Sequence, residues 1–393
     1  MTTPSDLLVE GIVADAFKTR SFLPGDEPTE SELTVRLQKG SVLLDGLGKE
    51  AALLALSVLP GDTRRLFLAP MERGHSGARV FRGRYIDREG MASRPFVFKF
   101  GEWFKLEQER TRTALARGSI AGLGVPIFRK SMGNALLVQE FAGLDDKNIL
   151  IDLAAACRRG AGVSALDNLF ERRLATWYRR PARKWITIRE VFSQYTDDDL
   201  LSFEGCPEQW SELHDWVQAE AGVTCQDCKE AVSRALEWEF DSPLTCVHGD
   251  LHALNVLIDD LGNVWPIDFA WFQPAQSPLV DLVMLECSLK FRAIPRRSEL
   301  RGLLRAEALL LAEMVPAAIA AGRVPYSDQI ENVFRAVRRV REVAQSLAID
   351  FDAYRRALLV MTARSSRFEG SLNMAYLFGS LEILSAVLSA KGC

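Results

Sequence analysis

The sequence lacks an excess of charge of either sign and lacks any long apolar run. Its 393 residues carry 48 Lys and Arg against 52 Asp and Glu, which gives a formal net charge of −4. A slightly acidic chain has no bulk attraction for nucleic acid or for anionic lipid, so the balance disfavours nucleic acid as a partner. No apolar stretch approaches the roughly 20 residues that span a bilayer, and the first residues lack a positively charged leader. We therefore expect a cytoplasmic protein without a membrane anchor.

The sequence also lacks a disulfide framework, internal repeats and low-complexity segments. The seven cysteines are odd in number and scattered through a chain that is long enough to fold without disulfides, so we expect reduced thiols. A composition of 48% hydrophobic and 25% charged residues is ordinary for a globular protein. This composition excludes a disordered or fibrous chain.

Local patterning divides the chain into three parts, residues 1–58, 59–143 and 144–393. The first part is an N-terminal extension without a readable role, in which Ser31-Glu32-Leu33 is predicted to begin a helix. The second part has short β-branched and aromatic runs and one helix over Phe104 to Arg117, which ends at Gly118. The predicted strands of this part cover Arg65 to Leu68, Ala78 to Ile86, Arg94 to Phe100 and Ala135 to Phe141.

The third part is predicted to be mostly helical before residue 245 and again after residue 290. Between Arg172 and Trp185, cations alternate with aromatic residues, which would suit nucleic acid or an acidic partner. The acidic balance of the whole chain favours instead an insertion helix with a charged outer face. A second set of cations fits one solvated side of a helix: Arg335, Arg338, Arg339 and Arg341.

One segment of the third part is the most informative. Two short apolar strands, Asn255 to Ile258 and Val264 to Ile267, flank an Asp-Leu-Gly-Asn turn and are predicted to form a hairpin. A hairpin holds its ends close together. Asp250 and Asn255 lie in the loop before the first strand, and Asp268 directly follows the second. These three oxygen-bearing side chains can therefore converge on one site.

These residue types suit phosphoryl transfer from a nucleotide, in which a protein mainly positions groups and neutralises charge. Asp250 would take or orient the proton of an acceptor hydroxyl, while Asn255 and Asp268 would hold Mg²⁺ through oxygen. The spacing from Asp250 to Asn255 equals that in the protein-kinase catalytic loop. Asp268-Phe269 stands where kinases have the metal-binding Asp-Phe-Gly, with Ala270 in place of the glycine.

The run His-Gly-Asp-Leu-His-x-x-Asn from His248, followed by Ile-Asp-Phe from Ile267, resembles the aminoglycoside phosphotransferase and choline kinase branch of the kinase-like superfamily. The resemblance implies a two-lobed protein-kinase-like α+β fold that covers about residues 60 to 390. Such a fold has a small antiparallel β lobe with one helix and a larger, mostly helical lobe. The resemblance also implies ATP and Mg²⁺ as cofactors.

A region that binds the nucleotide is expected upstream of this segment. Gly74, Ser76 and Gly77 lie between two predicted strands, where a glycine-rich turn can bring backbone N–H groups close to phosphate oxygens. An ordinary hairpin turn has the same composition. Lys99 follows on the next strand, where a kinase places the lysine that pairs the α- and β-phosphates.

The lysine needs an acidic partner on the inserted helix to hold it extended. Either Glu107 or Glu109 can supply this partner, and we favour Glu109. The last predicted strand of the small lobe then runs into a hinge. Main-chain groups from Glu140 to Ala142 are predicted to meet the adenine edge.

Two residues are predicted to support the loop. His248 is expected to pack and to hydrogen-bond so that it holds the loop and the turn at Asp268 in place. Asp281 is a good N-cap residue, and the resemblance implies that an aspartate here braces the catalytic loop.

A second motif consists of five residue pairs on either side of the hairpin, which are Leu169-Phe170, Trp177-Tyr178, Asp281-Leu282, Leu285-Glu286 and Leu289-Lys290. This motif resembles the bacterial "ternary complex associated domain nine" family within the kinase-like proteins. Members of that family are associated with multi-component bacterial defence or effector systems. The narrower resemblance therefore implies protein partners but no particular substrate.

The sequence thus predicts an ATP- and Mg²⁺-dependent phosphotransferase that moves a γ-phosphoryl group to a hydroxyl of an unidentified small-molecule or protein acceptor. The alternative is a catalytically weak kinase-like binding module that recruits protein partners. A pure scaffold has no physical need for all of Lys99, Asp250, Asn255 and Asp268, which favours the enzyme. Transfer of the nucleotidyl group stays open, and no residue pattern identifies the acceptor.

Overall fold

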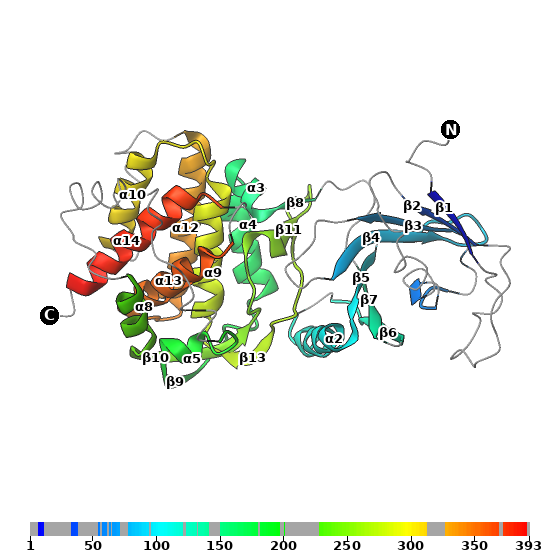
Figure 1. Cartoon of the computed structure of the whole chain (residues 1–393), viewed down its shortest axis with the longest axis horizontal. Coiled ribbons are helices and arrows are strands. Elements are labelled where there is room, and N and C mark those ends of the chain that lie inside the picture. The colour runs from blue at the N-terminus through cyan, green and yellow to red at the C-terminus, as the bar shows by residue number, and fades with distance from the viewer. Residues whose placement is uncertain are drawn as a thin grey trace. The chain divides into compact units, whose positions relative to one another are not determined.

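The computed structural model describes residues 7–11, 33–37, 54–55, 57–60, 63, 65–70, 78–93, 96–120, 123–131, 133–140, 150–179, 181–196, 200, 228–312, 327–368 and 372–390. The chain divides into two units, Met1–Asn148 and Ile149–Cys393 (Figure 1). The first is built on a sheet with a long helix, and the second is mostly helical. This content confirms the predicted α+β class. The boundaries that the sequence placed after residues 58 and 143 stay predictions.

The first unit contains a seven-stranded sheet with the strand order β1-β2-β3-β4-β5-β7-β6. Neighbouring strands are antiparallel except β2 and β3, which are parallel. The strands are β1 (Leu7–Gly11), β2 (Leu33–Leu37), β3 (Arg65–Pro70), β4 (Arg79–Ile86), β5 (Phe96–Glu102), β6 (Ile127–Ser131) and β7 (Asn134–Glu140).

The long helix of this unit, α2 (Trp103–Arg117), follows β5 directly and ends before Gly118, as the sequence predicts. Successive side chains of a strand point to opposite faces of a sheet. On β5, Phe98 and Phe100 therefore enter one buried cluster, whereas Lys99 faces the other side and binds a residue of α2. Leu106 of α2 packs in a second cluster with residues of β7 on that side.

Two elements of the first unit differ from the prediction. A helix was predicted to begin at Ser31, but Leu33–Leu37 is strand β2, which pairs with β3. The helix prediction was wrong because apolar residues occupy alternate positions of this segment, which is the period of a strand. Strand β6 was not predicted, because the exposed Arg129 and Lys130 interrupt the apolar pattern.

The second unit combines helices with two three-stranded sheets, ordered β13-β10-β9 and β12-β11-β8. Its α-helices are α3 (Leu153–Arg158), α4 (Gly162–Asn168), α5 (Ile188–Val191), α8 (Cys228–Leu236), α9 (Leu279–Ser288), α10 (Leu300–Ala312), α12 (Asp328–Ser346), α13 (Phe351–Ser365) and α14 (Met374–Ala390). Its strands are β8 (Ile151–Asp152), β9 (Ala182–Thr187), β10 (Glu239–Val247), β11 (Val256–Ile258), β12 (Val264–Pro266) and β13 (Gln273–Gln276). Two π-helical turns, Leu169–Arg173 and Leu289–Ala293, extend α4 and α9.

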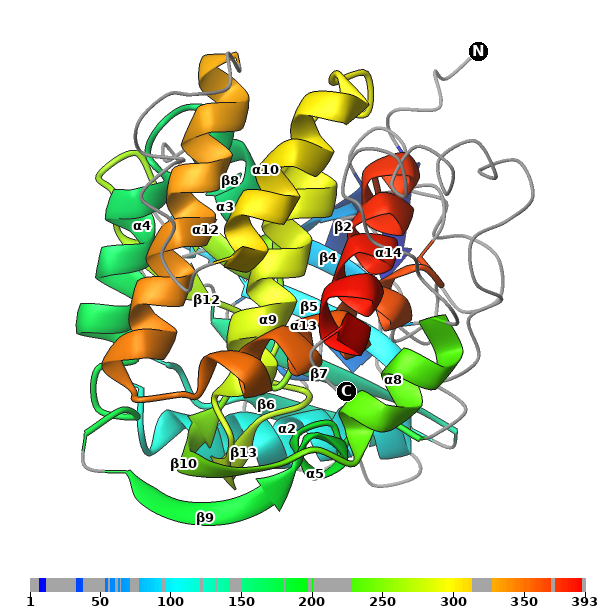
Figure 2. The same ribbon diagram turned by 90° about the vertical axis from the view of Figure 1, so that its left-hand side faces the viewer.

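Helix α9 lies at the centre of the second unit, and each of its residues is buried. Helices α12 and α13 pack against it, and α10 and α13 pack against α14 (Figure 2). A helix that is buried on all sides needs apolar residues on all sides. Its apolar residues include Leu279, Val280, Leu282, Val283 and Leu285. The two carboxylates that α9 also buries therefore require polar partners inside the unit.

The basic segment between Arg172 and Trp185 is not the insertion helix that the sequence predicted. Its second half forms β9, which pairs antiparallel with β10, also in a region predicted to be helical. Trp185 is 69% exposed, and Arg183 donates to Asp241 of β10 over 2.6 Å. The polar residues are tolerated because β9 is the edge strand of its sheet, where charged side chains are common.

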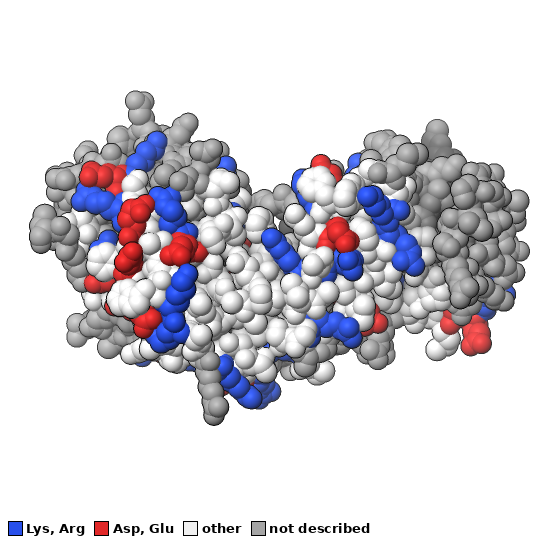
Figure 3. Space-filling model, turned by 90° about the horizontal axis from the view of Figure 1, so that it is seen from below, with Lys and Arg blue, Asp and Glu red and all other residues white. Residues whose placement is uncertain are grey.

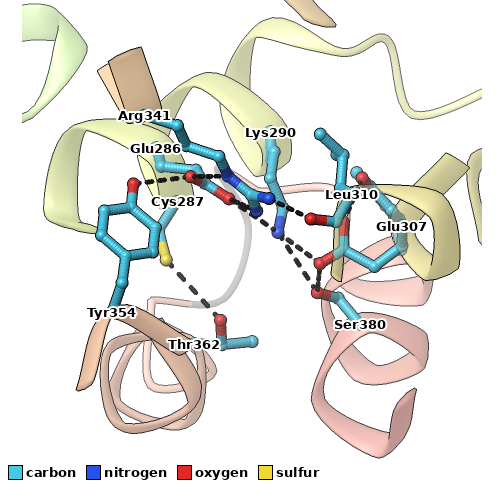
Figure 4. Close-up of polar contacts among 10 residues, drawn as sticks. Glu286, Cys287, Lys290, Glu307, Leu310, Arg341, Tyr354, Thr362 and Ser380 are labelled. Carbon is cyan, nitrogen blue, oxygen red and sulfur yellow. Dashed lines mark hydrogen bonds and ion pairs between the residues drawn. The ribbon is translucent and has the colours of Figure 1, made fainter. Parts of the chain in front are cut away.

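Arg341 was predicted to lie on the solvated side of a helix, but the structure buries it completely within α12. Its guanidinium binds both carboxylate oxygens of Glu286 on α9, at 2.6 and 2.9 Å. Beside this pair, Lys290 donates to Glu307 of α10 over 2.6 Å, and Tyr354 of α13 donates to Glu286 over 2.7 Å (Figure 4). We call Glu286, Lys290, Glu307 and Arg341 the buried quartet. Its two cations balance its two anions, as burial of charge requires.

The face of the second unit drawn in Figure 3 carries mixed charge, with basic and acidic side chains interspersed. On α12, Arg335 pairs with Glu331 over 3.2 Å. No helix among the described residues is long and apolar enough to cross a membrane.

Candidate active site

The predicted hairpin is present in the second unit and brings the candidate residues to one end. Strands β11 and β12 pair antiparallel, with Val256 opposite Pro266. Beyond this pair, the N–H of Ile267 donates to the carbonyl of Asn255 over 2.9 Å. Asn255 therefore lies beside the backbone that leads into Asp268.

Asn255 also binds the loop that carries Asp250. Its amide nitrogen Nδ2 donates to the carbonyl of Asp250 over 2.9 Å and approaches the carboxylate oxygen Oδ2 at 3.4 Å. The amide is thereby oriented, with its oxygen Oδ1 turned away from Asp250. Asn255 is buried, whereas the side chain of Asp250 is 32% exposed. A reacting group can therefore reach Asp250, and Asn255 offers an oxygen ligand at its side.

Asp268 has a left-handed backbone, with φ of 66°. Non-glycine residues seldom adopt this conformation, which costs about 1–3 kcal/mol and occurs often at functional sites. The next residue, Phe269, is buried and its ring lies 4.7 Å from the ring of His248. This contact helps to hold the strained turn that directs the Asp268 side chain.

The ring nitrogens of His248 link the loop that carries Asp250 to the turn at Asp268. The N–H of Asp250 donates to Nδ1 over 3.3 Å, so Nδ1 carries no proton. Nε2 then carries the proton and donates to the carbonyl of Ile267 over 2.8 Å. The neutral ring, which is fully buried, thus holds the loop of Asp250 against the turn at Asp268, as the sequence predicts.

Asp281 braces the loop from α9. Its oxygens Oδ2 and Oδ1 accept hydrogen bonds from the N–H groups of His248 and Gly249, at 2.7 and 2.8 Å. Asp281 is not the N-cap residue that the sequence suggested, because α9 begins at Leu279 and its N-cap is Pro278. Complete burial raises the pKa of Asp281 to about 7, although the two N–H donors favour the charged form.

The surroundings of Asp250 disfavour a negative charge on its carboxyl group. Burial, followed by the nearby charge of Asp268, raises the pKa of Asp250 to about 8, while Arg364 acts in the opposite direction. The two carboxylates are therefore close enough to repel each other. A cation beside them would relieve this repulsion, and carboxylate and amide oxygens are the ligands that Mg²⁺ prefers. The donor set of Asp268 and Asn255 fits that ion.

Gly249 permits the tight approach of the loop to the chain after Asp268. It has φ of 78°, and an added Cβ would lie 2.2 Å from the carbonyl oxygen of Trp271. Gly262, in the hairpin turn, has the same φ of 78° but no atom within 4 Å of its Cβ position. A comparison of these two glycines therefore separates the cost of a left-handed backbone from the cost of a steric clash.

We expect Gly262→Ala to lower the free energy of unfolding by about 1–2 kcal/mol, the cost of the left-handed backbone alone. Gly249→Ala should lower it by a further 1–3 kcal/mol or so, because the clash with a backbone atom forces the loop to move. Urea denaturation of both variants measures the difference. Equal losses would show that the contact with Trp271 does not constrain the loop.

Several polar and aromatic residues border Asp250 that the sequence did not indicate. Gln194 donates to the carbonyl of Gly249 over 2.6 Å, and the hydroxyl of Tyr195 lies 3.5 Å from the same oxygen. The guanidinium of Arg364 lies over the ring of Tyr195 at 3.9 Å. Gln194 and Tyr195 lie in the turn after α5 and Arg364 lies in α13, all far from Asp250 in the sequence, so no local motif marks them.

Lys99 pairs with Glu109 in the first unit. The distance between Nζ and Oε1 is 2.6 Å, and both side chains are buried. Glu107, the alternative partner, instead binds Arg110 through two contacts of 2.6 and 2.8 Å, and Arg110 lowers the pKa of Glu107. This buried ion pair holds the ammonium of Lys99 in a fixed place.

The structure describes only one of the other residues that are predicted to bind the nucleotide. Gly74, Ser76, Gly77 and Ala142 lie outside the described residues. Glu140 is the last residue of β7, where it is opposite Phe96 of β5. Their roles stay predictions.

Part of the chain, including the candidate site, matches the model of a known protein family. The family described as "Ternary complex associated domain 9" matches residues 196–356, a region that includes the hairpin and α9. It is the family that the second sequence motif resembles. No curated protein matches the chain.

Solved structures similar to this chain include three kinases or phosphotransferases. A thermostable mutant of an aminoglycoside phosphotransferase, in a ternary complex with ADP and hygromycin B, has 13% identity and a TM-score of 0.43 over 81% of this chain and 92% of that one. Glucosamine kinase has 16% identity and a TM-score of 0.38 over 84% and 94%. Choline kinase from Streptococcus pneumoniae has 13% identity and a TM-score of 0.31 over 75% and 96%.

Proposed function

We propose that this protein is an ATP- and Mg²⁺-dependent phosphotransferase that moves the γ-phosphoryl group to a hydroxyl of an acceptor. The observation that carries the proposal is the cluster of Asp250, Asn255 and Asp268 at one end of a hairpin. His248 and Asp281 hold this cluster through backbone hydrogen bonds. A protein that only bound partners would gain nothing from a strained aspartate and an accessible carboxylate with a raised pKa.

In the proposed reaction, the acceptor hydroxyl gives its proton to Asp250 while its oxygen forms a bond to the γ-phosphorus. The bond from the γ-phosphorus to the bridging oxygen breaks, and ADP leaves. A pKa of about 8 suits a group that accepts and releases a proton near neutral pH. Asn255 and Asp268 would hold Mg²⁺, which neutralises phosphate charge when bound.

Lys99 supplies the proposed contact to the α- and β-phosphates, with Glu109 holding it in place. The predicted turn at Gly74, Ser76 and Gly77 would add backbone N–H groups, and the chain from Glu140 to Ala142 would meet the adenine. The description of the matched family supports a further proposal, that the enzyme works with protein partners in a multi-component system. A cytoplasmic location is part of the same proposal.

A thermal-shift experiment tests the nucleotide site directly. ATP should raise the melting temperature of the wild type only when Mg²⁺ is present, because a ligand that binds the folded state alone stabilises it by mass action. Asp268→Ala should abolish the shift that depends on Mg²⁺, whereas Asp260→Ala, at an exposed position of the hairpin turn, should keep it. GTP in parallel reports the choice of nucleotide.

Two results would contradict the proposal. An undiminished shift in Asp268→Ala would remove this residue from the metal site. Absence of any shift with either nucleotide would favour the binding module and direct the search to protein partners.

A further inference from the structure

An arginine, Arg364, lies near the proposed catalytic base. Arg364 lies in the last turn of α13, and its guanidinium packs over Tyr195 at 3.9 Å and near Phe368 at 5.2 Å from the ring centres. Aromatic rings on the guanidinium restrict its plane and reduce the entropy that binding would remove. The cation is therefore held in a fixed orientation before any ligand arrives.

Contacts through Tyr195 place this cation next to Asp250. The hydroxyl of Tyr195 lies 3.5 Å from the carbonyl of Gly249, the residue that precedes Asp250. The positive charge of Arg364 acts on the Asp250 carboxylate. Among the described residues the two side chains form no ion pair, although the charge of Arg364 favours the charged form of Asp250 by lowering its pKa.

The guanidinium also retains binding capacity. Its nitrogen Nε is buried and has no hydrogen-bond partner among the residues that the structure describes. Two other carboxylates act on Asp250: Asp268 is the proposed metal ligand, and Asp281 is already occupied by two backbone N–H groups. The two rings that contact the guanidinium of Arg364 are those of Tyr195 and Phe368. An anion that reached Arg364 would meet an oriented guanidinium that no carboxylate binds among the described residues.

An acceptor bound for transfer must bring a hydroxyl to Asp250, so the atoms near that hydroxyl lie close to Arg364. An ammonium group there would be repelled by the guanidinium and would meet aromatic faces that the arginine already covers. A carboxylate or phosphate group would instead form charge-assisted, two-pronged hydrogen bonds with it. The positive charge of Arg364 beside Asp250 therefore favours an anionic acceptor over a cationic one.

We propose that Arg364 binds an anionic group of the acceptor, and that the acceptor is a small hydroxyl compound bearing a carboxylate or a phosphate ester. The inference rests on the proposed phosphotransferase function and extends it to the class of substrate. Arg364 is then a substrate-binding residue that determines specificity, and the transfer step itself is unchanged: the hydroxyl proton goes to Asp250 and ADP leaves.

Charge-fractionated metabolites provide the test. Small metabolites of a bacterial extract are separated by ion exchange at pH 7 into anionic, neutral and cationic pools. Each pool is incubated with the purified full chain, Mg²⁺ and γ-labelled ATP, and the label transferred to organic products is counted. We expect transfer in the anionic pool, and the labelled product isolated from it then serves to identify one acceptor for kinetics.

Variants of Arg364 separate binding from a structural role. With the identified acceptor, Arg364→Gln should raise KM by about 10- to 100-fold, the loss expected for a charged hydrogen-bonded pair. Arg364→Lys should recover part of this loss, since it keeps the charge but not the fork. Arg301→Gln, an exposed arginine on α10, is the control and should leave KM unchanged.

The outcomes distinguish the two proposals. If the Mg²⁺-dependent shift with ATP is present but label enters only the neutral or cationic pool, or none of the three, the assignment of Arg364 is overturned and the nucleotide site stands. An unchanged KM in Arg364→Gln overturns it as well. If ATP produces no shift, the proposed function fails first and the acceptor assignment fails with it.

Discussion

The Asp250→Asn variant will transfer phosphoryl groups about 10²- to 10⁴-fold more slowly than the wild type, the usual contribution of a positioned acid–base group. Asparagine has the same shape, and the N–H of residue 250 can still donate to His248. Its amide cannot take the proton of an acceptor hydroxyl. The variant should therefore keep its fold and its Mg²⁺-dependent thermal shift with ATP while it loses turnover.

Initial rates of ADP release, with and without the anionic metabolite pool, provide the measurement. Asp260→Asn is the matched control, because Asp260 is an exposed aspartate in the turn of the same hairpin. The control should transfer at the wild-type rate. Retention of more than about a tenth of the wild-type rate by Asp250→Asn would contradict a role as general base.

The Arg341→Met variant will be strongly destabilised, by about 3–5 kcal/mol in the free energy of unfolding, because it breaks a fully buried ion pair. Methionine fills much of the space but leaves Glu286 and Glu307 with Lys290 as the remaining cation of the buried quartet. Arg335→Met is the control on the same helix. That arginine is 63% exposed and its pair with Glu331 should contribute less than about 1 kcal/mol.

A double variant separates lost charge balance from lost volume. Glu286→Gln combined with Arg341→Met leaves Lys290 and Glu307 as a neutral pair, so it should be more stable than Arg341→Met alone. Chemical denaturation of the wild type, Glu286→Gln, Arg341→Met and the double variant gives the coupling energy. If Arg341→Met lowers the free energy of unfolding no more than Arg335→Met does, burial of the quartet does not govern the stability of this unit.

Helix α9 connects the buried quartet to the candidate site. Its first turn carries Asp281, which holds the N–H groups of two loop residues, and its last residue, Ser288, accepts the N–H of Ala253 over 3.0 Å. Glu286 lies between these two contacts along the helix. The loop that presents Asp250 is therefore fixed at two points by one rigid element, which is itself anchored by the quartet.

Local sequence alone determined the hairpin, its turn and the order of Asp250, Asn255 and Asp268, because these features depend on residues within a short stretch of chain. The preference for Glu109 over Glu107 agrees with the observed pair to Lys99. Helix α2 and strands β3, β4, β5 and β7 were readable for the same reason, since apolar periodicity and a terminal glycine are local signals.

Tertiary structure alone decided which charges are buried and which border the catalytic loop. Arg341 looked like its exposed neighbours in sequence, and its burial depends on Glu286, 55 positions away. Arg364 and Tyr195 meet near Asp250 only because α13 packs beside the loop that follows β10. Strand β9 likewise depends on its pairing with β10. Contacts between residues so far apart in the sequence cannot be predicted from local sequence patterns. The desolvation and hydrogen bonding that favour these contacts arise only when the chain has folded.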